Sequence, residues 1–232
     1  MDRPFFSVIL PVHNQSSFIR SIVEGHAQSL SQLPIRYELL LVVNGSQDDS
    51  LIVCQKLSQD YPNIRVLESK MAGWGRAVKQ GLQEVKGDII CYTNSSRTTT
   101  KDLTLFLLYA MANPGTVIKA NRKIRESWIR RMGSLLYNIE CRSLFDLSCW
   151  DINGTPKVFP RKFTKLLQLS REDDLIDLEF NCICRQEDYP IIEIPIFSTK
   201  RLGGRSTTGY HSAMKMYCGA FQLWRQGNHY SD

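Results

Sequence analysis

The stretch Gly87-Asp88-Ile89-Ile90-Cys91-Tyr92-Thr93-Asn94-Ser95-Ser96 joins a short apolar run to a cluster of small polar residues. The apolar run predicts a strand buried on both faces. Ligands of open α/β sheets bind beyond the carboxyl ends of the strands, so the polar cluster marks an expected ligand site. Sites for metal-bound phosphates usually carry carboxylates, but Asn94, Ser95 and Ser96 are neutral and the next acid is Asp102. The sequence therefore predicts an uncharged strand tip.

Strands and helices alternate along the whole chain, on both sides of this stretch. The other predicted strands are Phe5–Leu10, Tyr37–Val43, Ile64–Leu67, Thr116–Ala120, Pro156–Phe159 and Ile191–Ile196. The predicted helices are Ser16–Leu30, Asp48–Leu57, Gly73–Val85, Thr98–Ala112, Trp128–Leu144, Asp174–Gln186 and Tyr210–Arg225. This alternation indicates an α/β fold with a doubly wound, mainly parallel sheet and helices on both faces. We find no internal repeat or low-complexity linker, which favours a single domain.

The bulk composition is that of an ordinary globular protein. The chain has 232 residues, of which 43% are hydrophobic and 22% charged, and a net charge of +6. No apolar run reaches the roughly 18 residues of a membrane span, and the N-terminus lacks the layout of a signal peptide. Seven cysteines without a CxxC pair predict reduced, buried thiols in a cytoplasmic protein. The mild charge does not indicate nucleic acid as a partner.

Basic residues concentrate around Lys119–Arg131 and Lys200–Arg205, which favours anionic ligands such as phosphates or acidic lipid headgroups. The last predicted helix carries Met214, Tyr217, Phe221 and Trp224 on one face. That face is either a packing face or a membrane-binding one. The glycine-rich turns make neither GxGxxG nor a Walker lysine motif, the four histidines are scattered, and Ser95-Ser96 lacks a GxSxG elbow. Dinucleotide, P-loop, zinc and serine-hydrolase sites are therefore disfavoured.

Three short motifs stand in order along the first half of the chain. They are Pro11-Val12-His13-Asn14, the segment from Val42 to Asp48, and Gly73-Trp74-Gly75-Arg76-Ala77 with Gly81. Together they resemble the PxYN, VDDGSxD and GxGxA…G elements of the family 2 glycosyltransferases with the GT-A fold. Asn94 and Ser96 then occupy the two aspartate positions of the metal-binding DxD motif. The resemblance implies a nucleotide-sugar site formed by Pro11, His13, Asn14, Asn44, Ser46, Gly73, Arg76, Asn94, Ser95 and Ser96.

The second half is similar to the polyprenyl-phosphate (dolichol-phosphate) mannose and glucose synthases. The matching positions are Arg122, Arg130 and Ser134; Asp151, Gly154, Lys157, Phe159 and Arg161; Glu179; Glu193-Ile194-Pro195-Ile196; and Arg201, Gly204 and Ser206. The resemblance implies that Arg122, Arg130 and Ser134 hold an acceptor phosphate. It also implies a catalytic set of Asp151, Arg201 and Arg205, with Lys157, Glu179 and Ser206 nearby.

The resemblance implies one GT-A-like domain over 1–232, with a nucleotide-binding half (1–121) and an acceptor-binding half (122–232). We expect an inverting hexosyltransferase that uses a nucleotide-sugar of the UDP-glucose or GDP-mannose class. Its acceptor would be a polyprenyl phosphate at the cytosolic face of a membrane, reached by peripheral binding or through a membrane-protein partner. Without DxD aspartates, Arg201 and Arg205 would neutralise the leaving diphosphate. This predicts no cofactor, or only weak dependence on Mg2+ or Mn2+.

Alternatives stay open at this point. Asn44 and Ser46 are equally typical of helix capping, Asp151 of a turn, and Glu179 of a structural partner. The chain as a whole is also compatible with a catalytically inactive GT-A-fold protein that binds nucleotide-sugars or partners in a regulatory role. A nucleotidyltransferase on the same fold is a more distant alternative, because it would need its own metal carboxylates.

Overall fold

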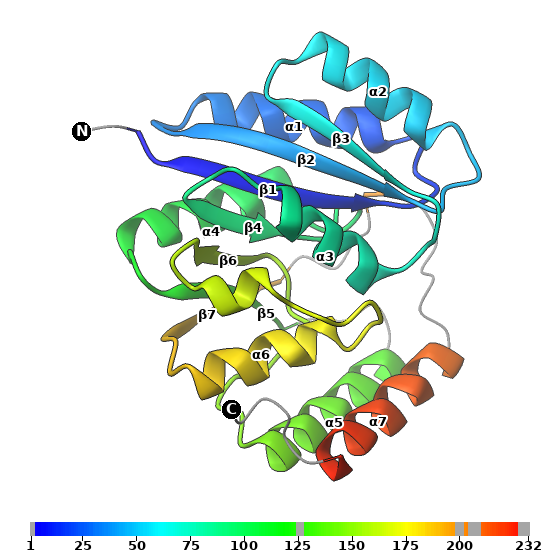
Figure 1. The fold of residues 1–232 in the computed structure, drawn as a ribbon, viewed down its shortest axis with the longest axis vertical. Helices are drawn as coiled ribbons and strands as arrows, with labels where there is room; N and C mark the ends of the chain where they lie inside the picture. The colour runs from blue at the N-terminus through cyan, green and yellow to red at the C-terminus, as the bar shows by residue number, and fades with distance from the viewer. Residues whose placement is uncertain (1–2, 124–127, 198–201, 204–209, 227–232) are drawn as a thin grey trace.

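The structure, a computed structural model, describes residues 3–123, 128–197, 202–203 and 210–226. Its centre is one seven-stranded sheet of order β3-β2-β1-β4-β6-β5-β7 (Figure 1). The strands are β1 (Phe5–Val12), β2 (Arg36–Asn44), β3 (Ile64–Ser69), β4 (Ile89–Tyr92), β5 (Val117–Arg122), β6 (Lys157–Pro160) and β7 (Ile191–Ile196). Among the strands of the described residues only β6 runs antiparallel to its neighbours, so the prediction of a mainly parallel sheet is confirmed.

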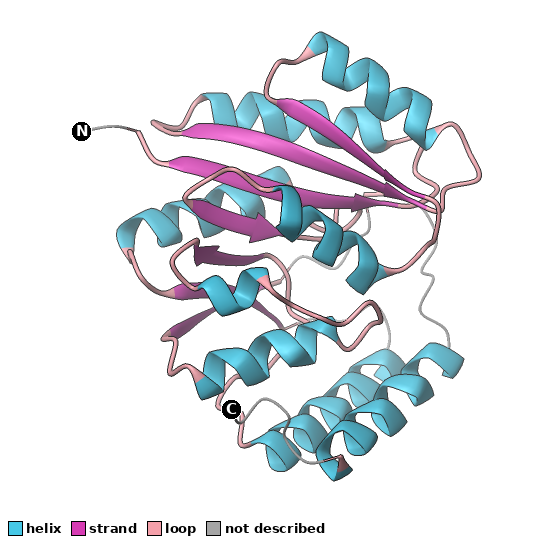
Figure 2. Cartoon of the chain, in the orientation of Figure 1, coloured by secondary structure: helices cyan, strands magenta, loops and turns pink. Residues whose placement is uncertain are grey.

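Helices cover both faces of this sheet (Figure 2). They are α1 (Ile19–Ser31), α2 (Ser50–Asp60), α3 (Trp74–Glu84), α4 (Thr100–Ala112), α5 (Trp128–Phe145), α6 (Ile176–Gln186) and α7 (Tyr210–Arg225), with a 3-10 turn η1 (Thr164–Leu167). Alternate residues of a strand point to opposite faces. Accordingly Val8 and Leu10 pack with α1, α2 and α4, whereas Ile9 packs with α3, η1 and α6.

The pair α5 and α7 forms an outer layer beyond α6. Cys141 of α5, Leu178 of α6 and Ala220 of α7 belong to one separate buried cluster. The ring of Tyr137 lies edge-on to that of Tyr217, with 5.5 Å between centroids, and the Tyr217 hydroxyl donates to the Gly133 carbonyl. The two helices therefore lie side by side, at the bottom of Figure 1.

The sheet direction fixes where a ligand site belongs. Because six strands run the same way, the ends of β1, β2, β4 and β5 meet at one edge of the sheet. The segment before β6 also reaches this edge, because β6 begins there, opposite Tyr92. None of the helices in the described part of the chain combines the length and apolar character that a membrane crossing requires.

Candidate active site

The ends of β1 and β2 meet in a cluster built around Asn44, which is 4% exposed. Its side-chain nitrogen donates to the Val12 carbonyl (2.9 Å), and its side-chain oxygen accepts from the Gly73 backbone N–H (3.0 Å). The backbone carbonyl of Asn44 lies 2.8 Å from Nδ1 of His13. Asn44 thus joins β1, β2 and the start of α3, and the predicted alternative that it caps the following helix is not what its contacts show.

His13, Asn14 and Ser46 lie beside Asn44, at the solvent side of the cluster. Because a carbonyl oxygen only accepts, Nδ1 of His13 carries the proton and Nε2 accepts from the Asn14 amide at 3.2 Å. The Asn14 backbone N–H donates to Ser46 Oγ (3.1 Å), and the Asn14 side-chain oxygen accepts from the backbone of Gln47 (2.8 Å). The structure therefore brings together the residues predicted for the base and ribose side of a nucleotide.

The start of α3 is fixed by the loop that precedes α6. A side chain at Gly75 would place its Cβ 2.2 Å from the Asp173 carbonyl oxygen, so only glycine allows this approach. One residue on, Arg76 pairs with Glu172 (Nη2 to Oε2, 2.8 Å). Gly73 therefore lies in the cluster around Asn44, while the Arg76 guanidinium is held toward the loop before α6.

The tip of β4 satisfies most of its own polar groups. Ser95 Oγ lies 2.9 Å from both the Pro11 carbonyl and Gln15 Oε1. The Asn94 side-chain oxygen accepts from both the backbone N–H (3.1 Å) and the hydroxyl (2.8 Å) of Ser96. The backbone N–H of Leu202 in turn donates to the Ser96 carbonyl at 2.7 Å, which places Leu202 beside this tip.

The side-chain oxygens of Asn94, Ser95 and Ser96 are not suitable ligands for an Mg2+ or Mn2+ ion. Both cations prefer charged oxygen ligands, whereas the Asn94 oxygen already accepts two hydrogen bonds and the Ser95 hydroxyl points into the protein. The next acid along the chain, Asp102, accepts from the Thr99 hydroxyl (2.7 Å). Within the described ranges no group of three or more His, Cys, Asp and Glu side chains could hold a metal ion.

The end of β5 carries an arginine–carboxylate pair in which Asp151 is buried and Arg122 is partly exposed. Nε and Nη2 of Arg122 donate to the two carboxylate oxygens of Asp151, at 2.7 and 2.8 Å, and the Arg122 backbone N–H adds a third bond at 2.9 Å. Burial lowers the pKa of Arg122, but the Asp151 carboxylate outweighs this and the net shift is upward. The guanidinium has five N–H donors, and three of them have no partner among the described residues. With 22% of its side chain exposed, Arg122 can bind an anion.

Two further charged residues, the partly buried Glu193 and the buried Lys119, hold the Asp151 loop in place. Glu193 of β7 accepts from the backbone N–H groups of Trp150 (2.9 Å) and Asp151 (3.2 Å). Lys119, which is fully buried, donates to Glu193 (3.1 Å) and to the Asp151 carbonyl (2.6 Å). Sequence reasoning assigned no role to Lys119 and named Glu193 only as part of a motif. Glu193, an acid in the otherwise apolar β7, was the available signal.

Asp177 of α6 contacts residues from both halves of the chain, and the sequence did not predict a role for it. Its Oδ1 accepts from the Tyr92 hydroxyl (3.0 Å) and from the buried ammonium of Lys157, and its Oδ2 accepts from the Trp74 indole (2.9 Å). Burial lowers the pKa of Lys157, and the Asp177 carboxylate opposes that shift. Lys157, predicted near the site, is fully buried beneath it. It supports the site rather than lining its surface.

Of the remaining predicted residues, Glu179 and Ser134 lie in the described part of the chain. Glu179 is 2% exposed and accepts from the backbone N–H groups of Ser170 (2.8 Å) and Arg171 (2.9 Å). It therefore fixes the loop before α6, in line with the structural alternative. Ser134 lies partly buried in α5. The predictions for the Arg130 side chain, Arg201, Arg205 and Ser206 lie outside what the structure describes.

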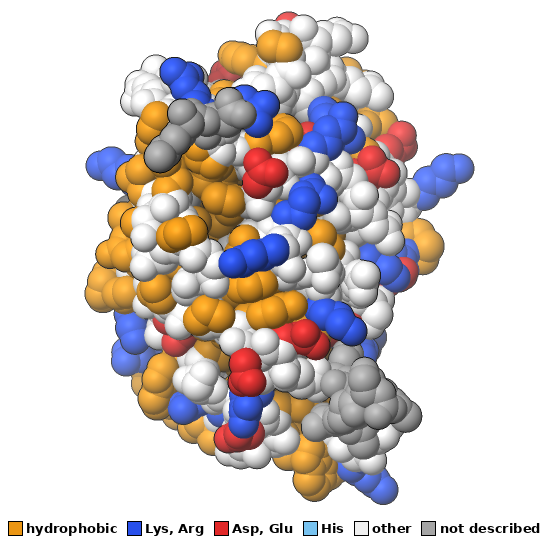
Figure 3. All heavy atoms as spheres, turned by 60° about the vertical axis from the view of Figure 1, so that its left-hand side comes forward, with side chains coloured by type: hydrophobic (Ala, Val, Ile, Leu, Met, Phe, Trp, Pro, Cys, Tyr) orange, Lys and Arg blue, Asp and Glu red, His pale blue; other side chains and the backbone are white. Residues whose placement is uncertain are grey.

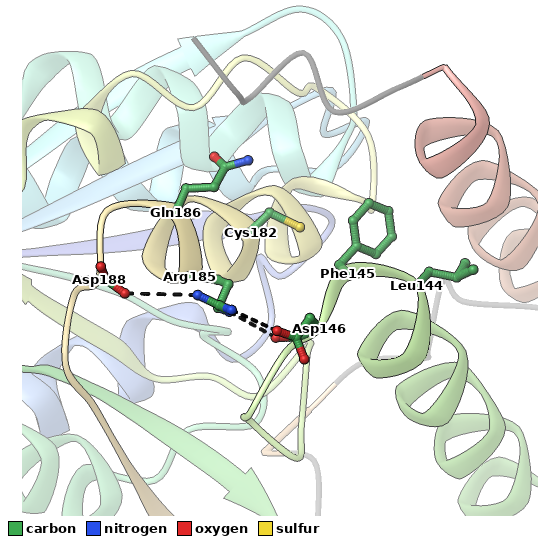
Figure 4. Close-up of a pocket in the computed structure, with 7 residues that line it drawn as sticks. All are labelled: Leu144, Phe145, Asp146, Cys182, Arg185, Gln186 and Asp188. Carbon is green, nitrogen blue, oxygen red and sulfur yellow. Dashed lines mark hydrogen bonds and ion pairs between the residues drawn. The ribbon is translucent and has the colours of Figure 1, made fainter.

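Two cavities lie at the opposite edge of the sheet, where β7 begins. The larger has a volume of about 330 Å³ and is lined by Leu144, Phe145, Asp146, Cys182, Arg185, Gln186 and Asp188 (Figure 4). Arg185 is paired there with Asp146 (2.7 Å). Figure 3 shows this side of the molecule, where hydrophobic, acidic and basic side chains are interspersed. Neither cavity is part of the site at the carboxyl edge.

Comparison with known proteins identifies the class. The profile of glycosyl transferase family 2 matches residues 7–167, so the chain belongs to glycosyl transferase family 2. The predicted family and the predicted GT-A-like fold are both confirmed. The fold is shared with glucosyl-3-phosphoglycerate synthase from Mycobacterium tuberculosis, solved with Mn2+, UDP and phosphoglyceric acid. That likeness has a TM-score of 0.72 at 17% identity and covers 97% of this chain and 79% of the other.

The chain is also similar to curated glycosyltransferases at low sequence identity. The undecaprenyl-phosphate 4-deoxy-4-formamido-L-arabinose transferase of Sodalis glossinidius is 24% identical over 90% of this chain and 64% of its own length. The protein of the same name from Proteus mirabilis is 23% identical over 86% of this chain and 61% of its own length. The chain thus spans less than two thirds of the length of these relatives.

Proposed function

We propose that this chain is an inverting glycosyltransferase that moves a sugar from a nucleotide-sugar to a polyprenyl phosphate. The observation that carries the proposal is the Arg122–Asp151 pair at the end of β5. It lies at the same sheet edge as the cluster around Asn44, so an anionic acceptor and a nucleotide could be held next to each other. The acceptor named for the curated relatives, undecaprenyl phosphate, carries such an anion.

The donor side is proposed to bind the nucleotide through His13, Asn14, Ser46 and the backbone around Gly73. We propose a hexose donor of the UDP-glucose or GDP-mannose class. Support comes from the hydrogen bonds that fix these groups at the ends of β1 and β2. The shared fold with a synthase solved with UDP is compatible with this arrangement.

The acceptor side is proposed to bind phosphate through Arg122, with Arg130 and Ser134 on the following helix. A phosphate monoester is already an anion at neutral pH, so the reaction needs positioning more than a strong general base. Both oxygens of Asp151 are engaged by Arg122, which makes Asp151 a positioning residue in this proposal rather than a base.

The departing diphosphate requires a positive partner. The side-chain oxygens at Asn94–Ser96 are poor ligands for a divalent cation. We therefore propose that Arg201 and Arg205 supply fixed positive charge, and that the reaction depends weakly or not at all on metal. The test is transfer from UDP-glucose and from GDP-mannose to undecaprenyl phosphate, with Mn2+ and with EDTA. Activity retained in EDTA and lost in Arg201→Ala supports this part, and activity lost in EDTA contradicts it.

The acceptor role of Arg122 is tested by Arg122→Lys, which keeps the positive charge opposite Asp151 but removes the bidentate hydrogen bonding of the guanidinium. We expect the KM for polyprenyl phosphate to rise by about tenfold or more. The affinity for the nucleotide-sugar, measured by calorimetry, should stay within about twofold. The control is Arg36→Lys, an exposed arginine at the start of β2. An unchanged acceptor KM would overturn the assignment, and nucleotide-sugar binding without transfer to any acceptor would favour the inactive binding protein.

A further inference from the structure

The helix α5 is apolar on two opposite sides. Tyr137 and Cys141 face the buried cluster shared with α6 and α7. Trp128, Leu135 and Ile139 recur at helical spacing on the other side, and all three are exposed. A helix that is hydrophobic all round is normally covered on all sides. The outer side of α5 has no cover among the described residues.

The neighbouring helix α7 extends this apolar surface. Tyr217 packs against α5, as one of the two predicted alternatives requires. Met214, Phe221 and Trp224 remain exposed, and the rings of Phe221 and Trp224 contact each other with centroids 5.8 Å apart. We define the α5–α7 face by side chains that are between 43% and 73% exposed, namely Trp128, Leu135, Leu136, Ile139, Met214, Phe221 and Trp224.

Basic residues outnumber acidic residues on both helices. Of the described basic side chains of α5, Arg131 is exposed and Arg142 lies over the Trp150 ring at 3.9 Å, and the one acid of α5 is the partly buried Glu140. The helix α7 carries Lys215 and Arg225 and no acid. Apolar side chains with tryptophans among them, bordered by lysine and arginine, are typical of helices that lie in the interface of an anionic bilayer. A protein surface would complement this face only if it were itself both apolar and acidic.

We propose that the α5–α7 face docks on an anionic lipid bilayer. This inference deepens the proposed function, since α5 follows directly on the strand that ends at Arg122. A face resting on the bilayer would hold the Arg122 end of the sheet near lipid-borne phosphates. The basic side chains at its border would lie at the level of the lipid headgroups, with their aliphatic stems against the apolar side chains.

The test is co-sedimentation of the full chain with vesicles, without nucleotide-sugar or polyprenyl phosphate. One set is neutral phosphatidylcholine, and in the other about a third of the lipid is phosphatidylglycerol. We expect binding to the anionic set, weakened at least about tenfold in Leu136→Gln/Ile139→Gln/Phe221→Gln. The matched control, Ile52→Gln/Leu105→Gln/Leu108→Gln, removes three similarly exposed side chains from α2 and α4 and should bind as the native chain does. Circular dichroism verifies that both variants are folded.

A double charge reversal tests whether the basic side chains attract the anionic lipid. Arg131→Glu/Lys215→Glu should abolish the preference for anionic over neutral vesicles. Equal binding of the native chain and the α5–α7 variant would overturn the proposal. So would sedimentation velocity showing that the native chain dimerises through this face and binds no vesicles. Because the assay contains no substrates, vesicle binding can succeed even where the transfer reaction fails.

Discussion

Asn44 shows how one side chain can serve both the sheet and the site. Asn44→Ala removes the partner of the Val12 carbonyl and of the Gly73 N–H, both in buried surroundings. We expect a loss of about 3 kcal/mol in the free energy of unfolding, because unsatisfied buried backbone groups are costly. Urea titration measures this loss, and calorimetry should show weaker nucleotide-sugar binding.

Asn44→Asp refines the same test. The carboxylate keeps an acceptor for Gly73 but places an oxygen where the amide donated to the Val12 carbonyl. We expect it to be destabilised as well, although Asp is the residue of the resembling motif at this position. Asn113→Ala, which loses one bond at an exposed helix end, is the control. If Asn44→Asp is as stable as the native chain, the hydrogen-bond assignment of Asn44 is wrong.

His26 is buried without a hydrogen-bond partner on either ring nitrogen. Burial alone lowers the pKa of His26 from 6.5 to about 4. The unfolded chain therefore binds a proton at higher pH than the folded one, and stability is lost as the pH falls from 6.5 toward 4. By pH 4.5 this group alone costs about 2.5 kcal/mol.

His26→Leu removes the titrating group. We expect the variant to lose about 2.5 kcal/mol less than the native chain when urea unfolding is compared at pH 7 and at pH 4.5. The comparison at pH 7, where His26 is neutral, is the internal reference for any packing change. An identical pH dependence of the two proteins would show that His26 is protonated in the folded state.

At the scale of elements, two helical glycines make a contrasting pair. Gly75 in α3 lies against the backbone of Glu172 and Asp173, whereas Gly133 in α5 has open space at its Cβ position. Gly75→Ala should force the loop before α6 away from α3, cost about 2 kcal/mol and weaken nucleotide-sugar binding. Gly133→Ala should instead stabilise the protein by about 0.5–1 kcal/mol. Thermal unfolding measures both, and stabilisation by both substitutions would contradict the close contact at Gly75.

Most elements could be predicted because their patterns are local. The apolar run Tyr37–Val43 indicates a strand covered on both faces, and β2 is that strand. Pro156–Phe159 likewise predicts a strand. However, four residues contain no information about partners, so the antiparallel insertion of β6 between β4 and β5 could not be predicted. The single turn η1 was missed, since it lacks a helical repeat.

The site residues also include some that local patterns predict and others whose roles depend on tertiary structure. His13, Asn14 and Ser46 could be placed together, because the carboxyl ends of parallel strands share an edge. Asp177 and Glu193 could not be assigned their roles. An acid within an apolar segment has the same sequence pattern whether it is solvated or paired with a buried lysine, and Lys119 and Lys157 lie far from them in sequence. Their pairing is a property of tertiary structure.

At the scale of the whole molecule, the fold sorts its thiols by burial. Six cysteines are buried, and only Cys218 of α7 is exposed. Burial raises the pKa of Cys54, Cys141 and Cys182 to about 12, which leaves them almost entirely as unreactive thiols at neutral pH. With an aromatic disulfide reagent we expect one fast-reacting thiol in the native protein and seven after denaturation. In Cys218→Ser the fast phase should vanish. A persisting fast phase would mean that the buried cluster opens readily.

The reversed strand β6 has a consequence for how such a chain can diversify. The segment that leads into β6 reaches the carboxyl edge between β4 and β5, and its Trp150–Asp151 backbone is hydrogen-bonded to Glu193 of β7 rather than to β1 or β2. A change in this segment would therefore act on Arg122 and β7, and would remove none of the hydrogen bonds that join the turns after β1 and β2, which we propose hold the nucleotide. Under the roles proposed for the two halves, transplanting this one segment between relatives would give chimaeric enzymes with a new acceptor and an inherited donor.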